Sequence, residues 1–385
     1  MILSNLKDQR VDSRRRISMD FCYEDSDRPS GTLYFEACDG TAERMRPRVD
    51  GFAIAFLPLA MWHRERRLRV EGTLCTRLAS GLSTINDVFL SWYPHYTRIA
   101  VEPDDGFAVT WPSAERRTAS MLSGGIDGLA ALRLNRLHYP LDHPESIRDC
   151  ITLFGINNFD LDSRGPVPER LAAFDERIGR LAKLAAKESF TLHALYTNIR
   201  SLAPSYRYWT QMGYGAAHIS VAQLFHGYMD TVLYASDGDG ANPPPGAWHP
   251  LIVPHFSTHA VRVEATEVAM KRVEKTEVVS TWEYGRRYMQ PCHWIRIPGS
   301  GRINCGRCEK CIRTMLTLIG LGRLKEVSAF DEDDVPPSLL FQMSLTNRVK
   351  ADLLQETIPG LLCAGRRDLA RAVRARLALY RLFRR

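Results

Sequence analysis

Four of the nine cysteines lie close together in the chain: Cys292, Cys305, Cys308 and Cys311. Their spacing, C-x12-C-x2-C-x2-C, ends in NCGRCEKC. Zn²⁺ binds four thiolates in tetrahedral sites, and a C-x2-C turn brings two sulfurs onto one ion at about 2.3 Å. We therefore expect a structural zinc site in which all four cysteines hold Zn²⁺. An iron–sulfur cluster and four unliganded thiols are the alternatives that the spacing leaves open.

A second stretch, SGGIDG at residues 123–128, has the composition of an anion-binding loop. It follows a short apolar run and precedes a helical pattern, and its two glycines let bare backbone N–H groups approach an anion. The N-terminus of the following helix adds unpaired N–H groups and the positive end of its dipole. We expect six residues to hold phosphate groups: Ser123, Gly124, Gly125, Ile126, Asp127 and Gly128.

Asp127 is the unusual member of this loop, because a carboxylate repels phosphate unless a cation lies between them. Mg²⁺ would resolve the conflict, since it binds one or two carboxylates together with phosphate oxygens. The alternative is a plain strand–helix turn in which the glycines relieve crowding and Asp127 caps the helix. The loop is not a Walker motif, because no G-K-[ST] follows the glycines.

Three basic residues elsewhere are candidates for contact with phosphate. Arg200 ends the segment YTNIR after an apolar run, which is where ligands bind in open α/β sheets. It would contact phosphate or a substrate carboxylate in a bidentate manner, or else be an exposed loop residue. Lys271 and Lys275 would share one face of a helix, which suits pyrophosphate, although a solvated basic face is the alternative.

A change of pattern near residue 116 predicts the elements that must position these residues. Short apolar runs then alternate with helical patterns, which is typical of a parallel sheet. The expected strands are 118–122, 150–154, 190–195 and 231–234, and the expected helices are 128–137, 169–187 and 215–229. We predict an α/β domain over residues 116–330, built on a doubly wound parallel sheet and including the four-cysteine site.

Two further units flank this predicted domain. Residues 1–115 carry β-branched and aromatic residues in short runs, which predicts a strand-rich N-terminal domain. Its expected strands are 32–37, 51–57, 67–70 and 98–109, with a helix at 84–92. The acidic, proline-flanked DEDDVPP at 331–337 marks the start of a helical C-terminal extension over residues 331–385. The zinc site would staple the helical region that follows the sheet.

The net charge of +7 comes from one end of the chain. Residues 366–385 contain eight Arg and one Asp, a sum of +7, so the remainder is neutral. Neutrality argues against nucleic acid, which needs Lys and Arg dispersed over a binding face. Four apolar residues recur at helical spacing in this segment: Leu369, Val373, Leu377 and Tyr380. A packed amphipathic helix with a solvated Arg face is the main interpretation, and contact with an anionic partner is the other.

The composition is that of a globular protein, with 45% hydrophobic and 25% charged residues. The longest apolar stretch, residues 52–62, contains Pro58 and is much shorter than the roughly 20 residues that span a bilayer. The N-terminus is charged where a secretory signal needs an apolar segment. We expect a cytoplasmic protein without membrane contact.

Together, the loop and the cysteine cluster resemble the PP-loop ATP pyrophosphatases. SGGIDG is similar to the SGGxDS loop of that superfamily, with Gly128 in place of the last serine. An SGGxD loop early in the chain and a C…CGxCxxC cluster late in it resemble the 7-cyano-7-deazaguanine synthase family and its extended homologues. The segment Lys275-Thr-Glu-Val-Val is similar to that family's K-x-E-I-V segment, whose lysine lies near the phosphates. The resemblance covers residues 116–320.

This resemblance implies an ATP-dependent enzyme that binds ATP and Mg²⁺ at the loop, with Asp127 and Lys275 as catalytic residues. Such enzymes transfer AMP to a carboxylate or carbonyl oxygen and release pyrophosphate, after which a nitrogen nucleophile displaces AMP to give an amide. A second activation and dehydration of that amide gives a nitrile. The acceptor would be a small molecule, a peptide or a protein, and a homodimer is an open alternative to a monomer. Two other interpretations stay open: an RNA-thiolating or RNA-aminating PP-loop enzyme, and a degenerate nucleotide-binding scaffold.

Overall fold

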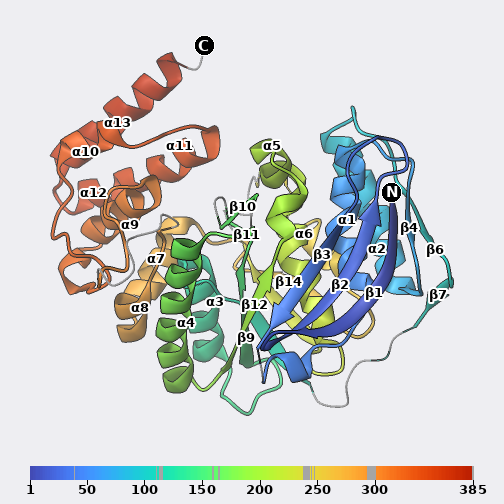
Figure 1. Cartoon of the computed structure of the whole chain (residues 1–385). Coiled ribbons are helices and arrows are strands. Elements are labelled where there is room, and N and C mark those ends of the chain that lie inside the picture. Colours follow the sequence, from blue (N-terminus) through green and yellow to red (C-terminus); the bar gives the residue numbers. More distant parts are fainter. Residues whose placement is uncertain are drawn as a thin grey trace.

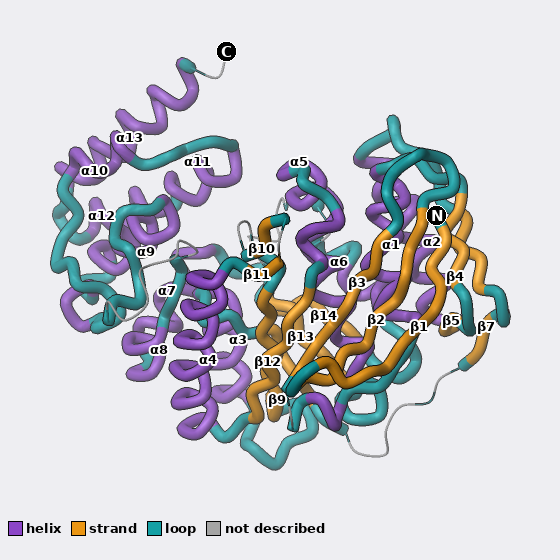
Figure 2. Tube along the Cα trace, in the orientation of Figure 1, coloured by secondary structure: helices purple, strands orange, loops and turns teal. Residues whose placement is uncertain are grey.

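Ten strands of the protein form one mixed sheet with helices on both faces (Figure 1, Figure 2). The computed structural model describes residues 1–38, 40–109, 111, 116–157, 160–163, 165–236, 243, 245–246, 248–292 and 301–383. The sheet has a parallel half that carries the predicted loop and an N-terminal half that continues it.

Five strands form the parallel half. In spatial order they are β14 (Arg262–Thr266), β13 (Thr231–Ala235), β8 (Thr118–Met121), β9 (Ile147–Phe154) and β12 (Thr191–Thr197). If these five strands are numbered 1 to 5 along the chain, their order in the sheet, read from β12, is 3-2-1-4-5. The chain therefore adds β9 and β12 on one side of β8 and then adds β13 and β14 on the other side. Open α/β sheets bind ligands beside such a reversal, beyond the carboxyl ends of the strands. The predicted parallel sheet is confirmed, and β14 is a strand that was not predicted.

Helices cover both faces of this half. Their bounds are α3 (Ile126–His138), α4 (Pro168–Glu188), α6 (Tyr214–Ser220) and α7 (Arg272–Ser280). α3, α4 and α7 contribute to one hydrophobic core, whereas α6 contributes to the core on the other face. The predicted helices at 128–137 and 169–187 are confirmed. The one predicted at 215–229 is shorter than expected, because the chain tightens into a 3-10 helix over Val221–Phe225.

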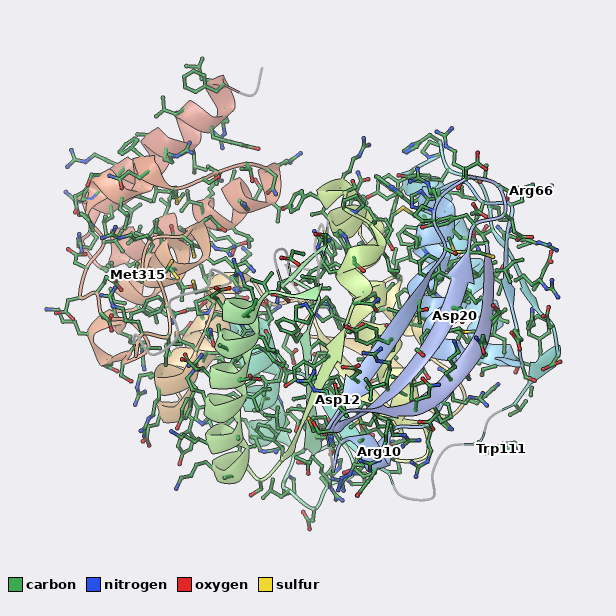
Figure 3. All side chains as sticks on the ribbon, viewed as in Figure 1. Arg10, Asp12, Asp20, Arg66, Trp111 and Met315 are labelled. Carbon is green, nitrogen blue, oxygen red and sulfur yellow. The ribbon has the colours of Figure 1, made fainter. Side chains whose placement is uncertain are left out.

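The other five strands continue the sheet beyond β12. They are β3 (Gly31–Ala37), β2 (Arg14–Cys22), β1 (Ile2–Val11), β4 (Arg67–Val70) and β6 (Ala100–Pro103). β3, β2 and β1 are antiparallel, while β4 and β6 run parallel to β1. The predicted strands at 32–37 and 67–70 are confirmed. The β1–β2 hairpin, which turns at Asp12 (Figure 3), was not predicted because its charged residues hide the alternation of buried and exposed positions.

Two-residue strands make two further pairs outside the large sheet. These are β5 (Leu74–Cys75) with β7 (Phe107–Ala108), and β10 (Leu161–Asp162) with β11 (Gly165–Pro166). The predicted strand at 98–109 is therefore two short strands, β6 and β7, separated by a turn.

The predicted strand at 51–57 is wrong, because this segment lies inside a helix, α1 (Val49–Trp62). Every residue from Val49 to Met61 is buried, so the sequence shows neither a helical nor a strand period there. A short, wholly apolar run cannot be assigned by periodicity alone. The next helix, α2 (Thr76–Trp92), confirms and extends the helix predicted at 84–92.

The two halves of the sheet are joined where β12 pairs antiparallel with β3. Asn198, which follows β12, accepts a hydrogen bond from the N–H of Tyr34 (3.0 Å) and donates one to the carbonyl oxygen of Thr32 (2.7 Å). On the face of the sheet that α1, α2 and α6 cover, one hydrophobic core includes residues from Met1 to Val263. Residues 1–115 therefore share a sheet and a core with the parallel half.

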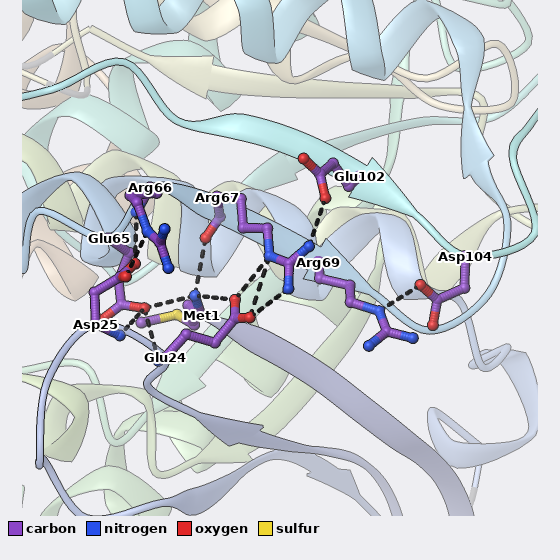
Figure 4. Close-up of polar contacts among 9 residues, drawn as sticks. All are labelled: Met1, Glu24, Asp25, Glu65, Arg66, Arg67, Arg69, Glu102 and Asp104. Atoms are coloured by element: carbon purple, nitrogen blue, oxygen red, sulfur yellow. Dashed lines mark hydrogen bonds and ion pairs between the residues drawn. The ribbon is translucent and has the colours of Figure 1, made fainter.

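Ion pairs fasten the start of the chain to the outer strands (Figure 4). The amino group of Met1 lies 2.9 Å from Glu24 and 2.6 Å from the fully buried Glu65. Arg67 of β4 pairs with Glu24 at 2.6 Å and with Glu102 of β6 at 3.1 Å. The Arg67 guanidinium lowers the pKa of Glu24 to about 2. These contacts hold β1, β4 and β6 in their parallel pairing.

The C-terminal part of the protein is helical, as predicted. Its helices are α8 (Glu283–Tyr288), α9 (Glu309–Gly320), α10 (Pro337–Gln342), α11 (Arg348–Gln355), α12 (Thr357–Cys363) and α13 (Arg367–Leu382); a short helix, α5 (Tyr206–Tyr208), lies earlier in the chain. The C-terminal helices lie on the side of α3 and α4, away from the N-terminal strands (Figure 1). Leu369, Val373 and Leu377 are buried there, which confirms the predicted apolar face of α13.

Candidate functional site

The SGGIDG segment forms the turn between β8 and α3, at the carboxyl edge of the parallel strands. Gly124 has a φ of +81°, a conformation that favours glycine, and Gly125 is the N-cap residue of α3. Ser123 is exposed at the start of the turn. The first turn of α3 therefore presents unpaired N–H groups beside an exposed hydroxyl, an arrangement that can bind an anion. The predicted strand–loop–helix order is confirmed.

Asp127 lies in the first turn of α3, but no side-chain hydrogen bond caps this helix. Its Oδ2 pairs instead with the guanidinium of Arg272, and its Oδ1 lies 3.9 Å from Nζ of Lys275. Both bases come from α7, far away in the sequence. Oδ1 is buried and accepts no hydrogen bond from the residues that the structure describes. The interpretation of Asp127 as a helix cap is wrong, whereas the two predicted catalytic residues do lie side by side.

Lys275 is buried where β13 ends. Its side chain is 1% exposed, and its Nζ donates a hydrogen bond to the carbonyl oxygen of Ser236 at 2.6 Å. Burial raises the pKa of Glu267, which follows β14, while the nearby Lys275 lowers it and Asp127 raises it further. Two acidic and two basic residues therefore lie near one another beyond the carboxyl ends of β8, β13 and β14, where the strand order reverses. They are Asp127, Glu267, Arg272 and Lys275.

Gly128 packs against the strand that precedes the loop. A Cβ built at this position would lie 2.9 Å from the carbonyl oxygen of Met121 at the end of β8. Because that neighbour is backbone, it cannot swing away as a flexible side chain would. A side chain at the last position of SGGIDG would therefore clash with the backbone of β8, which explains why this position is glycine.

The loop also contacts the segment between α8 and Cys292. The N–H of Gln290 donates a hydrogen bond to the carbonyl oxygen of Gly124 at 2.7 Å. Arg180 of α4 donates to the side-chain oxygen of Gln290 at 3.0 Å, and Leu181 packs 3.8 Å from a Cβ placed on Gly124. Gln290 precedes Cys292 by two residues, so the loop and the cysteine cluster share one supporting segment.

The four predicted cysteines do form a cluster. Their sulfurs all lie within 4.8 Å of one another. The Sγ–Sγ distance is 3.8 Å between Cys305 and Cys311, and 3.9 Å between Cys292 and Cys308. A tetrahedral ion with metal–sulfur bonds of about 2.3 Å holds its ligands about 3.8 Å apart. The cluster could therefore hold one metal ion such as zinc.

A tight turn and a helix start position these sulfurs. Sγ of Cys305 accepts hydrogen bonds from the N–H groups of Cys308 (3.1 Å) and Arg307 (3.4 Å), which favour a thiolate. The turn includes Gly306 with a φ of +66°. Cys308 is the N-cap residue of α9, so the positive end of this helix lies beside the sulfurs.

Asn304 fixes the chain on both sides of the cluster. Its side-chain amide donates to the carbonyl oxygens of Met289 and Ala329, each at 2.9 Å, and its oxygen accepts from the N–H of Cys292 at 3.3 Å. The side chain is buried, so these bonds are shielded from water. No sequence pattern distinguished Asn304 from the other polar residues of this segment.

Lys271 and Arg200 are the two other predicted phosphate contacts. Lys271 is exposed in front of α7, where its N–H donates to Glu274 at 2.7 Å. The cluster of basic residues around Lys271 did indicate a charged site, but it is Arg272 of this cluster that pairs with Asp127. Arg200 follows β12 on the same sheet edge and stacks 4.4 Å from the ring centre of Trp209. Burial lowers its pKa to about 10.

Comparison of the chain with protein-family models, with curated proteins and with solved structures found no match. Within the described part of the chain, no helix is both long enough and apolar enough to cross a bilayer. The function must therefore be argued from the two sites themselves.

Proposed function

We propose that the protein is a PP-loop ATP pyrophosphatase that transfers AMP to an oxygen of its acceptor and releases pyrophosphate. The observation that carries this proposal is the meeting of Asp127, Arg272 and Lys275 beside the Ser123–Gly125 turn. A glycine turn at a helix N-terminus, backed by two cations, suits the β and γ phosphates of a nucleotide. Its place beside a reversal of strand order suits a ligand of this size.

In this proposal the protein acts mainly through position and charge. The N–H groups of the turn and the cations of α7 would hold the leaving pyrophosphate in line while an acceptor oxygen attacks the α-phosphorus. Ammonia or another nitrogen nucleophile would then displace AMP to give an amide. A nitrile would require a second ATP, which transfers AMP to the oxygen of the primary amide so that this oxygen leaves with AMP. Asp127 fits Mg²⁺, because its buried Oδ1 receives no hydrogen bond from a described residue. Mg²⁺ bound there would shield the charge of the phosphates.

The cysteine cluster has a structural role in this proposal. Four sulfurs complete a tetrahedral shell, so a bound Zn²⁺ would have no open position for a substrate. The ion would instead fix Cys292 and, through Gln290, the back of the phosphate loop. The acceptor, whether a small molecule, a peptide or a protein, would bind beyond the loop.

The products of ATP cleavage test this proposal. Purified protein, ATP and Mg²⁺ are incubated with a cell extract of small molecules and peptides, and the nucleotides are separated by chromatography. We expect AMP and pyrophosphate, and Asp127→Asn should slow their formation about a hundredfold. Glu277→Gln removes an exposed carboxylate of α7 and should leave the rate unchanged. Formation of ADP and phosphate would overturn the assignment, and failure to bind millimolar ATP would favour a scaffold without nucleotide.

A further inference from the structure

Two arginines of α4 lie beside the proposed phosphate loop, on the flank opposite α7. Leu181 of this helix packs against Gly124, and Arg177 is one turn away from it towards the carboxyl edge of the sheet. Arg180 reaches the loop through Gln290, to which it donates at 3.0 Å. The two guanidinium groups are three residues apart and so lie on one side of the helix.

Arg177 has a buried donor atom that the fold leaves unsatisfied, a state that it shares with Arg133 and Arg376 but that here occurs beside the loop. Its side chain is partly exposed, yet its Nε is buried and has no hydrogen-bond partner among the described residues. Arg136 of α3 is the structural contrast, because its guanidinium donates to the carbonyl oxygens of Glu188 and Ile147 at 2.8 and 2.6 Å. A buried donor without a partner costs stability, so an arginine kept in this state points to a missing acceptor.

The protein offers Arg177 little compensating charge. Burial lowers its pKa the most and the neighbouring Arg180 lowers it further, while Asp160, Tyr214 and Cys292 raise it. Asp160 is already engaged, because its Oδ2 accepts hydrogen bonds from the backbone N–H groups of Gly155 (3.2 Å) and Asn157 (2.9 Å). The carboxylate of Glu176 is 3.9 Å from Arg180, which is too long for a hydrogen bond.

We propose that Arg177 and Arg180 form a second anion subsite, on the side of the loop opposite Lys275. This subsite binds an oxyanion of a bound ligand. The subsite rests on the proposed function and deepens it. The oxyanion is a phosphate group of the nucleotide or a carboxylate of the acceptor, both of which match the planar guanidinium fork. If the oxyanion belongs to the acceptor, the acceptor is a carboxylic acid, and a carboxylate is also the group that AMP transfer activates.

The subsite is tested by binding of two probes, magnesium pyrophosphate and citrate, measured by calorimetry on the full-length protein. Arg177→Gln should weaken binding of at least one probe about tenfold, and Arg177→Lys should have a smaller effect because it keeps the charge but loses the fork. Lys183→Gln removes an exposed charge from the same helix and should change neither affinity. Thermal unfolding of Arg177→Gln should occur at or above the wild-type temperature, whereas a structural arginine would lose stability.

The pattern of loss identifies the source of the oxyanion. Weaker pyrophosphate binding assigns the subsite to the nucleotide, and a loss confined to citrate assigns it to the acceptor. Unchanged binding of both probes in Arg177→Gln, or no binding of either by the wild type, would overturn the subsite. If the wild type binds citrate through Arg177 but neither ATP nor pyrophosphate, the subsite stands while the proposed ATP chemistry fails.

Discussion

Gly128 shows how a single atom can decide which residue a loop accepts. The serine expected at this position in SGGxDS would bring a Cβ to 2.9 Å from the backbone of Met121. Glycine keeps the backbone N–H but removes a hydroxyl that could contact phosphate. The close packing of α3 on β8 is therefore sufficient to explain the departure.

The steric argument predicts opposite effects for two glycine substitutions in helices. Gly128→Ala should lower the free energy of unfolding by about 1–3 kcal/mol, because the added carbon meets backbone. Gly179→Ala in α4 should raise it by about 1 kcal/mol, since a Cβ there meets nothing within 4 Å and alanine favours a helix. Urea unfolding followed by circular dichroism measures both. Equal stability of the two variants would contradict the close packing at Gly128.

The residues predicted from sequence were those whose partners are near in the chain. SGGIDG and the C-x2-C turn are short, so their geometry follows from local spacing, and the structure forms both. Lys275 is an exception, because it was predicted from a basic helix face and from a resemblance to a known segment, while its partner Asp127 is distant in the chain. Arg272 and Gln290 reach the loop only through the packing of segments that are distant in the sequence, which one sequence does not reveal. Periodicity likewise failed for α1, where burial on all sides removes the period.

At the scale of elements, the cysteine cluster joins the segment after α8, the turn at Gly306 and the start of α9. Cys292 belongs to the segment behind the SGGIDG loop, whereas Cys308 and Cys311 belong to the start of α9. α9 in turn packs on α12 and shares the C-terminal core with α13. Removal of a metal from this position should loosen both the loop and the helical core.

We therefore expect about one Zn²⁺ per chain, bound by the four thiolates. Cys308→Ser should abolish metal binding and lower the thermal midpoint, because metal affinity is coupled to folding. Cys363→Ser changes an exposed thiol outside the cluster and should affect neither quantity. Elemental analysis and thermal unfolding give the two measurements. Iron in place of zinc, or a Cys308→Ser variant that retains the ion, would rule out this assignment.

At the scale of the whole molecule, the N-terminal residues are built into the sheet that carries the site. β3 pairs with β12, and α1 packs so closely on α6 that a Cβ at Gly51 would lie 2.5 Å from the carbonyl oxygen of Ser220. α2 approaches the 3-10 helix at Val253–Phe256 in the same way, with Gly81 against His255. Removing residues 1–115 would expose a strand edge and a large apolar face at once.

We expect the fragment 116–385 to aggregate or to unfold without a cooperative transition. A control chain that ends at residue 381 loses Leu382 and Phe383, which are 65% and 83% exposed, and should unfold like the full chain. Size-exclusion chromatography and thermal unfolding by circular dichroism compare the three proteins. A monomeric 116–385 fragment with a sharp transition would mean that the first 115 residues fold as a separate domain, because the apolar face of α6 would then tolerate water.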